Sequence, residues 1–96
     1  MYILVTYDIE TKNNEGQQRL RKIAKCCRNY GQRVQSSVFE CEVTPSQLLS
    51  LKHQLISIID KNVDSIRIYH MGNNYHSKIE RIGVETAIDI QGDLII

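Results

Sequence analysis

The sequence predicts a small α+β protein in which an antiparallel sheet carries two helices on one face. Two runs rich in β-branched and aromatic residues, at positions 2–9 and 64–71, are typical of strands. Two other segments, 17–30 and 45–60, repeat their apolar residues at the three- and four-residue spacing of amphipathic helices. A chain of 96 residues has the length of one domain, so we expect a single domain over residues 1–96.

The first strand and the helix after it are the clearest of these elements. Asp8 falls near the carboxyl end of the predicted strand 2–9. The helix over residues 17–30 has an apolar stripe that leaves its lysines and arginines on the other face. The stripe consists of Leu20, Ile23, Ala24, Cys27 and Tyr30. Gly31 is expected to end the helix in the left-handed conformation.

The segment 33–43 alternates well enough to predict one long strand. One of its faces would carry Arg33, Gln35, Ser37, Phe39 and Cys41. The other face would carry Val34, Ser36, Val38 and Glu40. Neither face is wholly polar, so the pattern does not say which one is buried.

A second helix, a third strand and shorter strands complete the chain. Thr44, Pro45 and Gln47 form a capping-box start with proline at the first helical position, and this helix is predicted to end near Asp60. A third strand follows over residues 64–71 and a short fourth strand over 78–82. The apolar tail 94–96 would be costly to leave in water and is predicted as a final strand.

The predicted order is β-α-β-α-β-β with a terminal strand. It resembles the ferredoxin-like sandwich, provided that the strand 33–43 is bent or broken. In that architecture both helices cover one sheet face, and residues such as Leu4, Phe39 and Tyr69 on the other face need another layer. A two-fold homodimer would supply that layer, and a domain this small gains stability from a partner.

Composition excludes several classes of protein. Shares of 42% hydrophobic and 24% charged residues are ordinary for a globular protein, and three cysteines with one proline exclude disulfide-rich and collagen-like chains. The cysteine spacing fits neither a redox pair nor a zinc site, so small apolar side chains are expected. Without a basic leader or the roughly 18 apolar residues of a membrane helix, a cytoplasmic protein with no membrane partner is predicted.

Charge is distributed unevenly, although the formal net charge is only +1. The segment 17–35 contains no acidic residue and six basic ones: Arg19, Arg21, Lys22, Lys25, Arg28 and Arg33. A local positive field of this kind attracts phosphate backbones. The same run also fits a solvated helix face. Charge alone therefore leaves both interpretations open.

Four segments of the chain resemble a known protein family. They are residues 7–9 (YDI), 30–40 (YGQRVQSSVFE), 64–69 (DSIRIY) and 78–83 (KIERIG). The most specific part is the glycine stop followed by Arg-Val-Gln-x-Ser-Val-Phe-Glu, which generic strand patterning rarely produces. Over nearly the whole chain these segments resemble the small CRISPR-associated endonuclease of the adaptation module, often called CRISPR-associated protein two.

The resemblance implies a ferredoxin-like homodimer in which the strand 94–96 adds to the partner's sheet. It also implies Mg²⁺-dependent cleavage of phosphodiester bonds, with RNA or DNA as substrate. A third implication is membership of the CRISPR integrase complex that inserts spacer DNA, where this subunit bridges two integrase dimers.

Asp8 is the residue we expect to be catalytic and to hold the metal. Mg²⁺ takes hard oxygen ligands and commonly uses only one or two carboxylates, so one aspartate from each chain of a dimer can suffice. The metal would activate water and neutralise charge on the scissile phosphate. The alternative is that Asp8 merely opens a turn after the strand.

The remaining predicted site residues come from the first helix and the strand after it. Phosphate contacts are expected from the basic residues Arg19, Arg21 and Arg33. A position near the dimer cleft, facing the interface or the substrate, is expected for Gln35, Ser37 and Phe39. Phe39 is more simply explained as an apolar contact, and hydrogen bonds across the subunit interface would explain the other two.

Other chemistries have little support in the sequence. No two of His53, His70 and His76 have a metal-ligand spacing on one element, although His76 lies in a loop that could touch substrate. No serine or cysteine nucleophile has an identifiable base, and no phosphate-binding glycine loop or RNP-like aromatic pattern is present. Besides a nuclease, a non-catalytic DNA-binding scaffold for the integrase and a ligand-sensing regulatory dimer remain possible interpretations.

Overall fold

The computed structural model describes residues 1–72, 74, 80 and 82. The elements in chain order are β1 (Tyr2–Asp8), α1 (Asn14–Arg28), β2 (Gly31–Gln35), β3 (Val38–Glu42), α2 (Pro45–Ile58) and β4 (Ser65–His70). This is the β-α-β-β-α-β order of a ferredoxin-like sandwich, and it confirms the predicted α+β class. The order read from the sequence was wrong at one place, because two strands lie between the helices where one was predicted.

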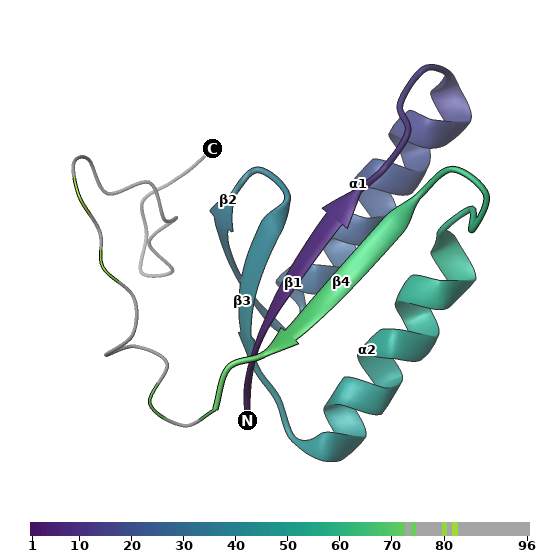
Figure 1. Ribbon diagram of the computed structural model, residues 1–96. Helices are drawn as coiled ribbons and strands as arrows, with labels where there is room; N and C mark the ends of the chain where they lie inside the picture. The colour runs from purple at the N-terminus through teal and green to yellow at the C-terminus, as the bar shows by residue number, and fades with distance from the viewer. Residues whose placement is uncertain (73, 75–79, 81, 83–96) are drawn as a thin grey trace.

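The strands form one antiparallel sheet in the order β2-β3-β1-β4. Both helices pack on the same face of this sheet, and within the described residues the opposite face has no helix over it (Figure 1). We refer to the uncovered side as the open face. The predicted arrangement of two helices on one face is therefore confirmed.

Alternation along β1 decides which side chains reach each face. Ile3, Val5 and Tyr7 are buried toward the helices, and the residues between them point to the open face. In the antiparallel register Asp8 lies opposite Ser65 of β4. Two side chains predicted for the uncovered face, Leu4 and Tyr69, are paired with each other there.

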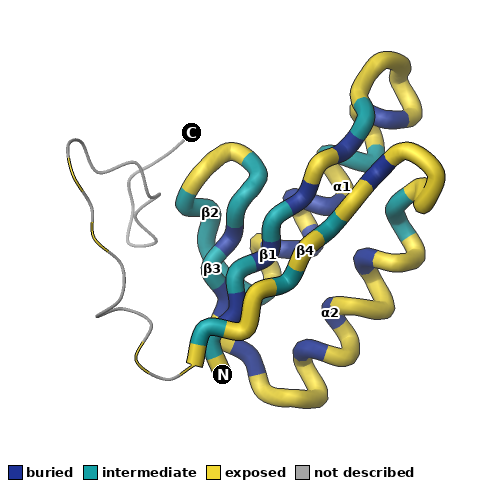
Figure 2. Tube along the Cα trace, viewed as in Figure 1, coloured by how far each residue is buried: buried dark blue, intermediate teal, exposed yellow. Residues whose placement is uncertain are grey.

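The core joins the helix-facing side of the sheet to the apolar stripes of both helices. Buried residues recur along one side of β1, β3 and both helices, while the residues between them are half-buried or exposed (Figure 2). The largest side chains with almost no exposure are Phe39, Ile3, Ile23, Leu51 and Leu55. The predicted stripe of α1 belongs to this core, with Ile23, Ala24 and Cys27 buried and Leu20 and Tyr30 packed at its edge.

The segment predicted as one strand over 33–43 is a hairpin. Ser36 and Ser37 form its turn, and the pairing shifts register between Arg33 and Gln35. Alternation continues on either side of the turn. Serine marks a turn more weakly than glycine, proline or asparagine, so the sequence pattern concealed the break. The predicted faces were therefore also wrong: Phe39 is completely buried in the core rather than on the open face.

The end of α1 also differs from the prediction. The helix is capped by Asn13 at its start and ends at Arg28, where the N–H of Asn29 donates to the carbonyls of Cys26 and Cys27. Gly31 has no positive φ and instead begins β2. A side chain at Gly31 would collide with the carbonyl oxygen of Glu40, so the glycine is required by the close approach of β3.

The start of α2 agrees with the sequence. Thr44 Oγ1 accepts from the N–H of Gln47 at 3.2 Å, and Gln47 Oε1 accepts from the N–H of Thr44 at 2.9 Å. This reciprocal pair is the predicted capping box. The predicted strand 78–82 lies outside the described residues apart from Glu80 and Ile82, and the predicted strand 94–96 lies wholly outside them.

Replacing Phe39 by Ala should lower the free energy of unfolding by about 3–5 kcal/mol, because a fully buried aromatic ring is lost and a cavity remains. Ile56→Ala is the control, since Ile56 is 56% exposed on α2 and its loss should cost less than about 0.5 kcal/mol. Urea denaturation measures both. Similar losses for the two variants would contradict the placement of Phe39 in the core.

Candidate active site and nucleic-acid interface

Asp8 is the last residue of β1 and is exposed on the open face. It borders a hollow of about 240 Å³ between the ends of β1 and β4, which we call the Asp8 hollow. The lining is mainly polar and consists of Thr6, Tyr7, Asp8, Ser65, Arg67 and Tyr69. Asp8 therefore stands at an accessible polar depression and not in a packed turn.

Arg67 is the cationic side chain of the Asp8 hollow. It lies opposite Thr6 in the sheet, diagonally across from Asp8 on the same face. Diagonal neighbours on one sheet face are about 7–8 Å apart at their bases, so long side chains at these positions can reach one bound group. Arg67 Nη1 donates to Tyr69 Oη at 3.2 Å, and this hydrogen bond helps to orient the guanidinium.

The sequence prediction did not assign a role to Ser65, Arg67 or Tyr69. A signal was present, because these residues alternate with Ile66 and Ile68, which pack against the core. Alternation places the three on one face of β4, but it does not reveal that β4 pairs with β1. The register that brings them beside Asp8 depends on tertiary structure.

The donor set at Asp8 fits a magnesium ion in chemistry and in number. Among the described residues of one chain, no group of three or more His, Cys, Asp or Glu side chains is close enough to form a metal cage. Mg²⁺ does not require such a cage, since one or two carboxylates with water and substrate phosphate complete its ligands. The single exposed carboxylate of Asp8 meets that requirement.

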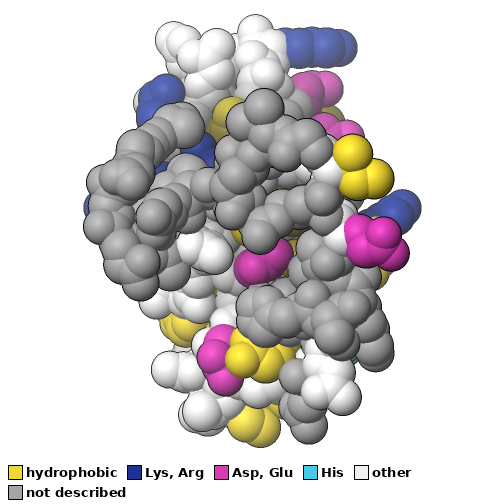
Figure 3. All heavy atoms as spheres, turned by 90° about the vertical axis from the view of Figure 1, so that its left-hand side faces the viewer, with side chains coloured by type: hydrophobic (Ala, Val, Ile, Leu, Met, Phe, Trp, Pro, Cys, Tyr) yellow, Lys and Arg dark blue, Asp and Glu magenta, His cyan; other side chains and the backbone are white. Residues whose placement is uncertain are grey.

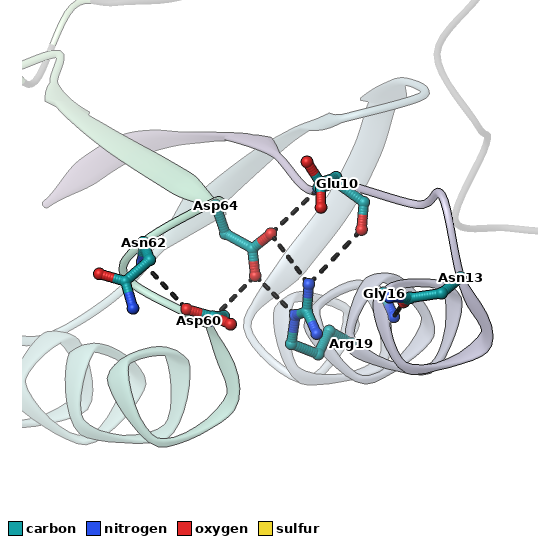
Figure 4. Close-up of polar contacts among 7 residues, drawn as sticks. All are labelled: Glu10, Asn13, Gly16, Arg19, Asp60, Asn62 and Asp64. Atoms are coloured by element: carbon teal, nitrogen blue, oxygen red, sulfur yellow. Dashed lines mark hydrogen bonds and ion pairs between the residues drawn. The ribbon is translucent and has the colours of Figure 1, made fainter.

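Arg19, predicted to contact phosphate, forms an ion pair with Asp64 instead of projecting freely. Arg19 Nε lies 2.7 Å from Asp64 Oδ2, and Nη2 lies 3.4 Å from Asp64 Oδ1 (Figure 4). The Asp64 side chain is fully buried, whereas that of Arg19 is 20% exposed. The placement favours a structural role for Arg19, and its contact with nucleic acid stays a prediction.

Asp64 connects the segments on both sides of the Asp8 hollow. Its carboxylate also accepts from the N–H of Glu10 at 3.0 Å and from the N–H of Asp60 at 2.9 Å. Glu10 follows Asp8 by two positions, and Asp64 directly precedes Ser65. The buried carboxylate therefore holds together the two chain segments that position Asp8 and its strand partner.

The pKa of Asp64 reflects this environment. Burial alone would raise the pKa, but hydrogen bonds from Arg19 and from the backbone N–H groups of Asp60 and Glu10 outweigh it and lower the pKa below its ordinary value. Asp64 therefore remains ionised at neutral pH and throughout mild acid.

Arg21 and Arg33 meet at a second, larger hollow between α1 and the β2–β3 hairpin, which we call the hairpin hollow. Its volume is about 760 Å³. The lining consists of Tyr7, Leu20, Arg21, Ala24, Lys25, Arg28, Arg33, Ser36 and Ser37. Because Arg33 is paired with the core residue Phe39, it lies on the helix side of the sheet, opposite to Asp8.

The other predicted interface residues are divided between the two sides of the sheet. Ser37 borders the hairpin hollow, and its carbonyl accepts from the N–H of Tyr7 at 3.1 Å. Gln35 is exposed on the open face, where it pairs with Val38. Phe39 lies in the core under the Arg33 guanidinium. The predicted common face of Arg33, Gln35, Ser37 and Phe39 is therefore wrong, because it assumed one continuous strand.

The histidines and cysteines add no second chemical centre in the described part of the chain. His53 and His70 are exposed on α2 and β4, and His76 lies outside the described residues. All three cysteines are free and buried. Burial raises the pKa of Cys27 to about 12 and that of Cys41 to about 11, so neither thiol is an available thiolate at neutral pH.

Residues 1–79 match the family model described as CRISPR associated protein Cas2. The chain belongs to the Cas2 family. The "CRISPR-associated endonuclease Cas2" of Halalkalibacterium halodurans is 56% identical over 95 residues, which cover 99% of each chain. The "CRISPR-associated endoribonuclease Cas2" of Nitratidesulfovibrio vulgaris is 49% identical over 96 residues, covering 100% of this chain and 94% of that protein.

Solved Cas2 structures have the same fold. The crystal structure of Streptococcus pyogenes Cas2 at pH 6.5 superposes with a TM-score of 0.80 at 52% identity, covering 86% of this chain and 100% of that one. The family resemblance read from the sequence is thus confirmed. None of the described helices is long and apolar enough to span a membrane.

Asp64→Asn should destabilise this Cas2 chain at neutral pH by about 1–3 kcal/mol, since it weakens buried hydrogen bonds to charged and backbone donors. Because folding lowers the pKa of Asp64, the stability that this carboxylate contributes is complete above the ordinary aspartate pKa of about 3.9. That contribution is lost as the pH falls through the lowered pKa of the folded state. The difference between native and variant should therefore shrink below about pH 4 in urea titrations.

Asp60→Asn is the matched control. Asp60 is exposed, and its Oδ1 accepts from the N–H of Asn62 at 3.0 Å, so the change should leave most of the acid dependence intact. If Asp64→Asn and Asp60→Asn had the same stability at every pH, Asp64 would not be the anchor described above.

Proposed function

We propose that this Cas2 chain is a metal-dependent endonuclease that cleaves RNA or DNA phosphodiester bonds at the Asp8 hollow. The observation that carries the proposal is an exposed carboxylate at a strand end that shares a polar hollow with a guanidinium diagonally across the sheet. The names of the relatives, endonuclease and endoribonuclease, support the same activity. The two names leave RNA and DNA as alternative substrates.

The residues of the hollow have separable roles in phosphodiester hydrolysis. Arg67 binds the non-bridging oxygens of the scissile phosphate, and the Tyr69 hydroxyl keeps its guanidinium oriented. Asp8 would hold Mg²⁺, which when bound activates water and neutralises charge on the phosphate. Cleavage adds the oxygen of one water molecule to phosphorus and breaks the bond to the leaving ribose or deoxyribose oxygen. Thr6 and Ser65 supply hydroxyls at the wall of the hollow.

A homodimer would complete this site. The open face carries Leu4 and Tyr69 without a covering helix among the described residues, and a chain of 96 residues has a small core. A partner sheet on this face would bury those residues and bring a second Asp8 toward the first. We propose that the strand 94–96 joins the partner's sheet, and that the dimer binds the CRISPR integrase.

The basic residues of α1 and β2 would guide nucleic acid to the dimer. Arg21 is exposed and free to meet phosphate, and Arg33 offers its guanidinium from the hairpin hollow. Arg19 would contribute less than these residues, because its charge is offset by the ion pair with Asp64. Gln35 is exposed on the open face and is suited to the subunit interface, whereas Ser37 is placed nearer to the basic hollow.

Asp8→Asn should abolish cleavage of labelled single-stranded RNA or duplex DNA in Mg²⁺, as a chelator should for the unchanged protein, because the metal loses its carboxylate ligand. The variant should keep the fold, since Asp8 is exposed. Glu42→Gln is the control, because it also removes an exposed carboxylate from the sheet but lies at the far end of β3. Undiminished cleavage by Asp8→Asn would exclude Asp8 as the catalytic residue.

A non-catalytic scaffold is the second candidate function. It is favoured by the separation of the basic hairpin hollow from Asp8 on opposite faces of the sheet. The same samples distinguish it: duplex binding without cleavage, unchanged by Asp8→Asn, would support a scaffold and would overturn the nuclease proposal.

Arg67→Gln should reduce cleavage by about tenfold or more, the equivalent of losing a charged hydrogen bond worth about 1.5–3 kcal/mol. Arg67→Lys should retain part of the activity because it keeps the charge without the planar fork. Tyr69→Phe removes only the acceptor of the Arg67 hydrogen bond and should have a smaller effect. Cleavage rates under single-turnover conditions measure all three. Equal rates for Arg67→Gln and the unchanged protein would remove Arg67 from the site.

A further inference from the structure

We propose that the hairpin hollow is a nucleotide-binding site, which takes a phosphate group on its basic wall and the attached nucleoside on its apolar wall. The site is distinct from the Asp8 hollow. Its lining comes from α1, the β2–β3 hairpin and the helix side of β1, whereas Asp8 projects from the open face. Binding there does not depend on cleavage at Asp8.

The charge of the hairpin hollow is the first argument. Four cationic side chains border it, Arg21, Lys25, Arg28 and Arg33, and none of the described acidic side chains does. Within the described residues none of the four has a carboxylate within 4.0 Å, since the ion pair found there joins Arg19 to Asp64. Figure 3 views the molecule from the hairpin side and shows lysine and arginine side chains at both margins of this face. Clustered cations without acidic partners favour an anionic ligand.

Arg33 supplies the second argument. Its guanidinium carbon lies 5.3 Å from the centre of the Phe39 ring, and that ring stacks on Tyr7 with centroids 6.2 Å apart. The guanidinium is thus held in place by the core. Its Nε atom is buried and has no hydrogen-bond acceptor in the described part of the structure. Buried donors without an acceptor are rare in proteins, and the rest of this guanidinium lines the hollow, where its donors favour a phosphate group.

The size and the apolar wall indicate more than a bare phosphate. A volume of about 760 Å³ lies within the range that binds small organic ligands and far exceeds one phosphate group. Leu20, Ala24 and Tyr7 form an apolar side next to the cations. Ser36 and Ser37, at the turn of the hairpin, add hydroxyl groups suited to a sugar or a phosphate. Together these features match a nucleoside phosphate.

The phosphate could belong to a free nucleotide or to the end of a nucleic-acid strand. The probes are adenosine 5′-monophosphate, inorganic phosphate, and a short single-stranded DNA with and without a 5′-phosphate. Calorimetric titration at low salt should detect adenosine monophosphate binding at least about tenfold tighter than inorganic phosphate. A strand-end site would bind the 5′-phosphorylated DNA more tightly than the other DNA. A free-nucleotide site would bind adenosine monophosphate more tightly than either strand.

The double variant Lys25→Gln/Arg28→Gln should weaken adenosine monophosphate binding by about tenfold or more and reduce its salt dependence. Arg33→Lys should also weaken binding, because it keeps a positive charge but loses the Nε donor and the planar contact with Phe39. Lys22→Gln/Lys52→Gln is the matched control, since it removes two exposed charges that do not border the hollow and should leave binding unchanged.

Three results would overturn the proposal: no binding of adenosine monophosphate at millimolar concentration, equal binding of it and inorganic phosphate, or equal losses in the hollow and control variants. Asp8→Asn should bind adenosine monophosphate normally. If Asp8→Asn loses cleavage but binds the nucleotide normally, both the nuclease proposal and the nucleotide-site proposal are supported. If the variant loses only nucleotide binding, the nucleotide-site proposal alone is rejected.

Discussion

The central strand β1 imposes the main constraint on this molecule. It pairs with β3 on one side and β4 on the other, so every second side chain must enter the core while its neighbours face away from the helices. Ile3, Val5 and Tyr7 satisfy the first requirement. The second leaves Asp8 on the open face, at the point where the strand ends. The chemistry of the open face therefore follows from the same alternation that forms the core.

The Asp64 carboxylate complements this arrangement at the end of the strand. The ends of strands commonly fray. Here the Asp64 carboxylate accepts hydrogen bonds from the backbone N–H of Glu10 and from the guanidinium of Arg19. The buried negative charge of Asp64 is tolerated because the groups that contact it donate hydrogen bonds to it. The result links α1, the loop after β1 and the start of β4 through one side chain. Asp8, although exposed, is thereby attached to a well-anchored frame.

Much of the fold could be predicted from sequence because its signals are local. The capping box at Thr44 and the stripe of α1 each depend on residues within a few positions of one another. The hairpin could not be predicted, because its serine turn has no strong local signal and its register shift near Val34 changes which residues share a face. Phe39 was for that reason assigned to the wrong side.

At the candidate site too, residues with a local sequence signal could be predicted and residues placed by tertiary pairing could not. Asp8 was identified because it falls near the end of a strand pattern and within a family motif. Arg67 and Tyr69 were not assigned, since their relation to Asp8 arises only when β4 pairs with β1. Arg19 shows the converse case: a basic residue in a basic run was expected to reach phosphate, but a buried partner 45 positions away engages it.

Tyr7 has an unusual position, because it lines both the Asp8 hollow and the hairpin hollow. A single strand separates the two depressions, and this residue forms part of the wall of each. The ring of Tyr7 points to the helix side, where it stacks on Phe39, so a substitution there would change the hairpin hollow and leave the side chains of the Asp8 hollow in place. The two depressions can therefore be altered one at a time, at Arg67 for the first and at Arg28 for the second.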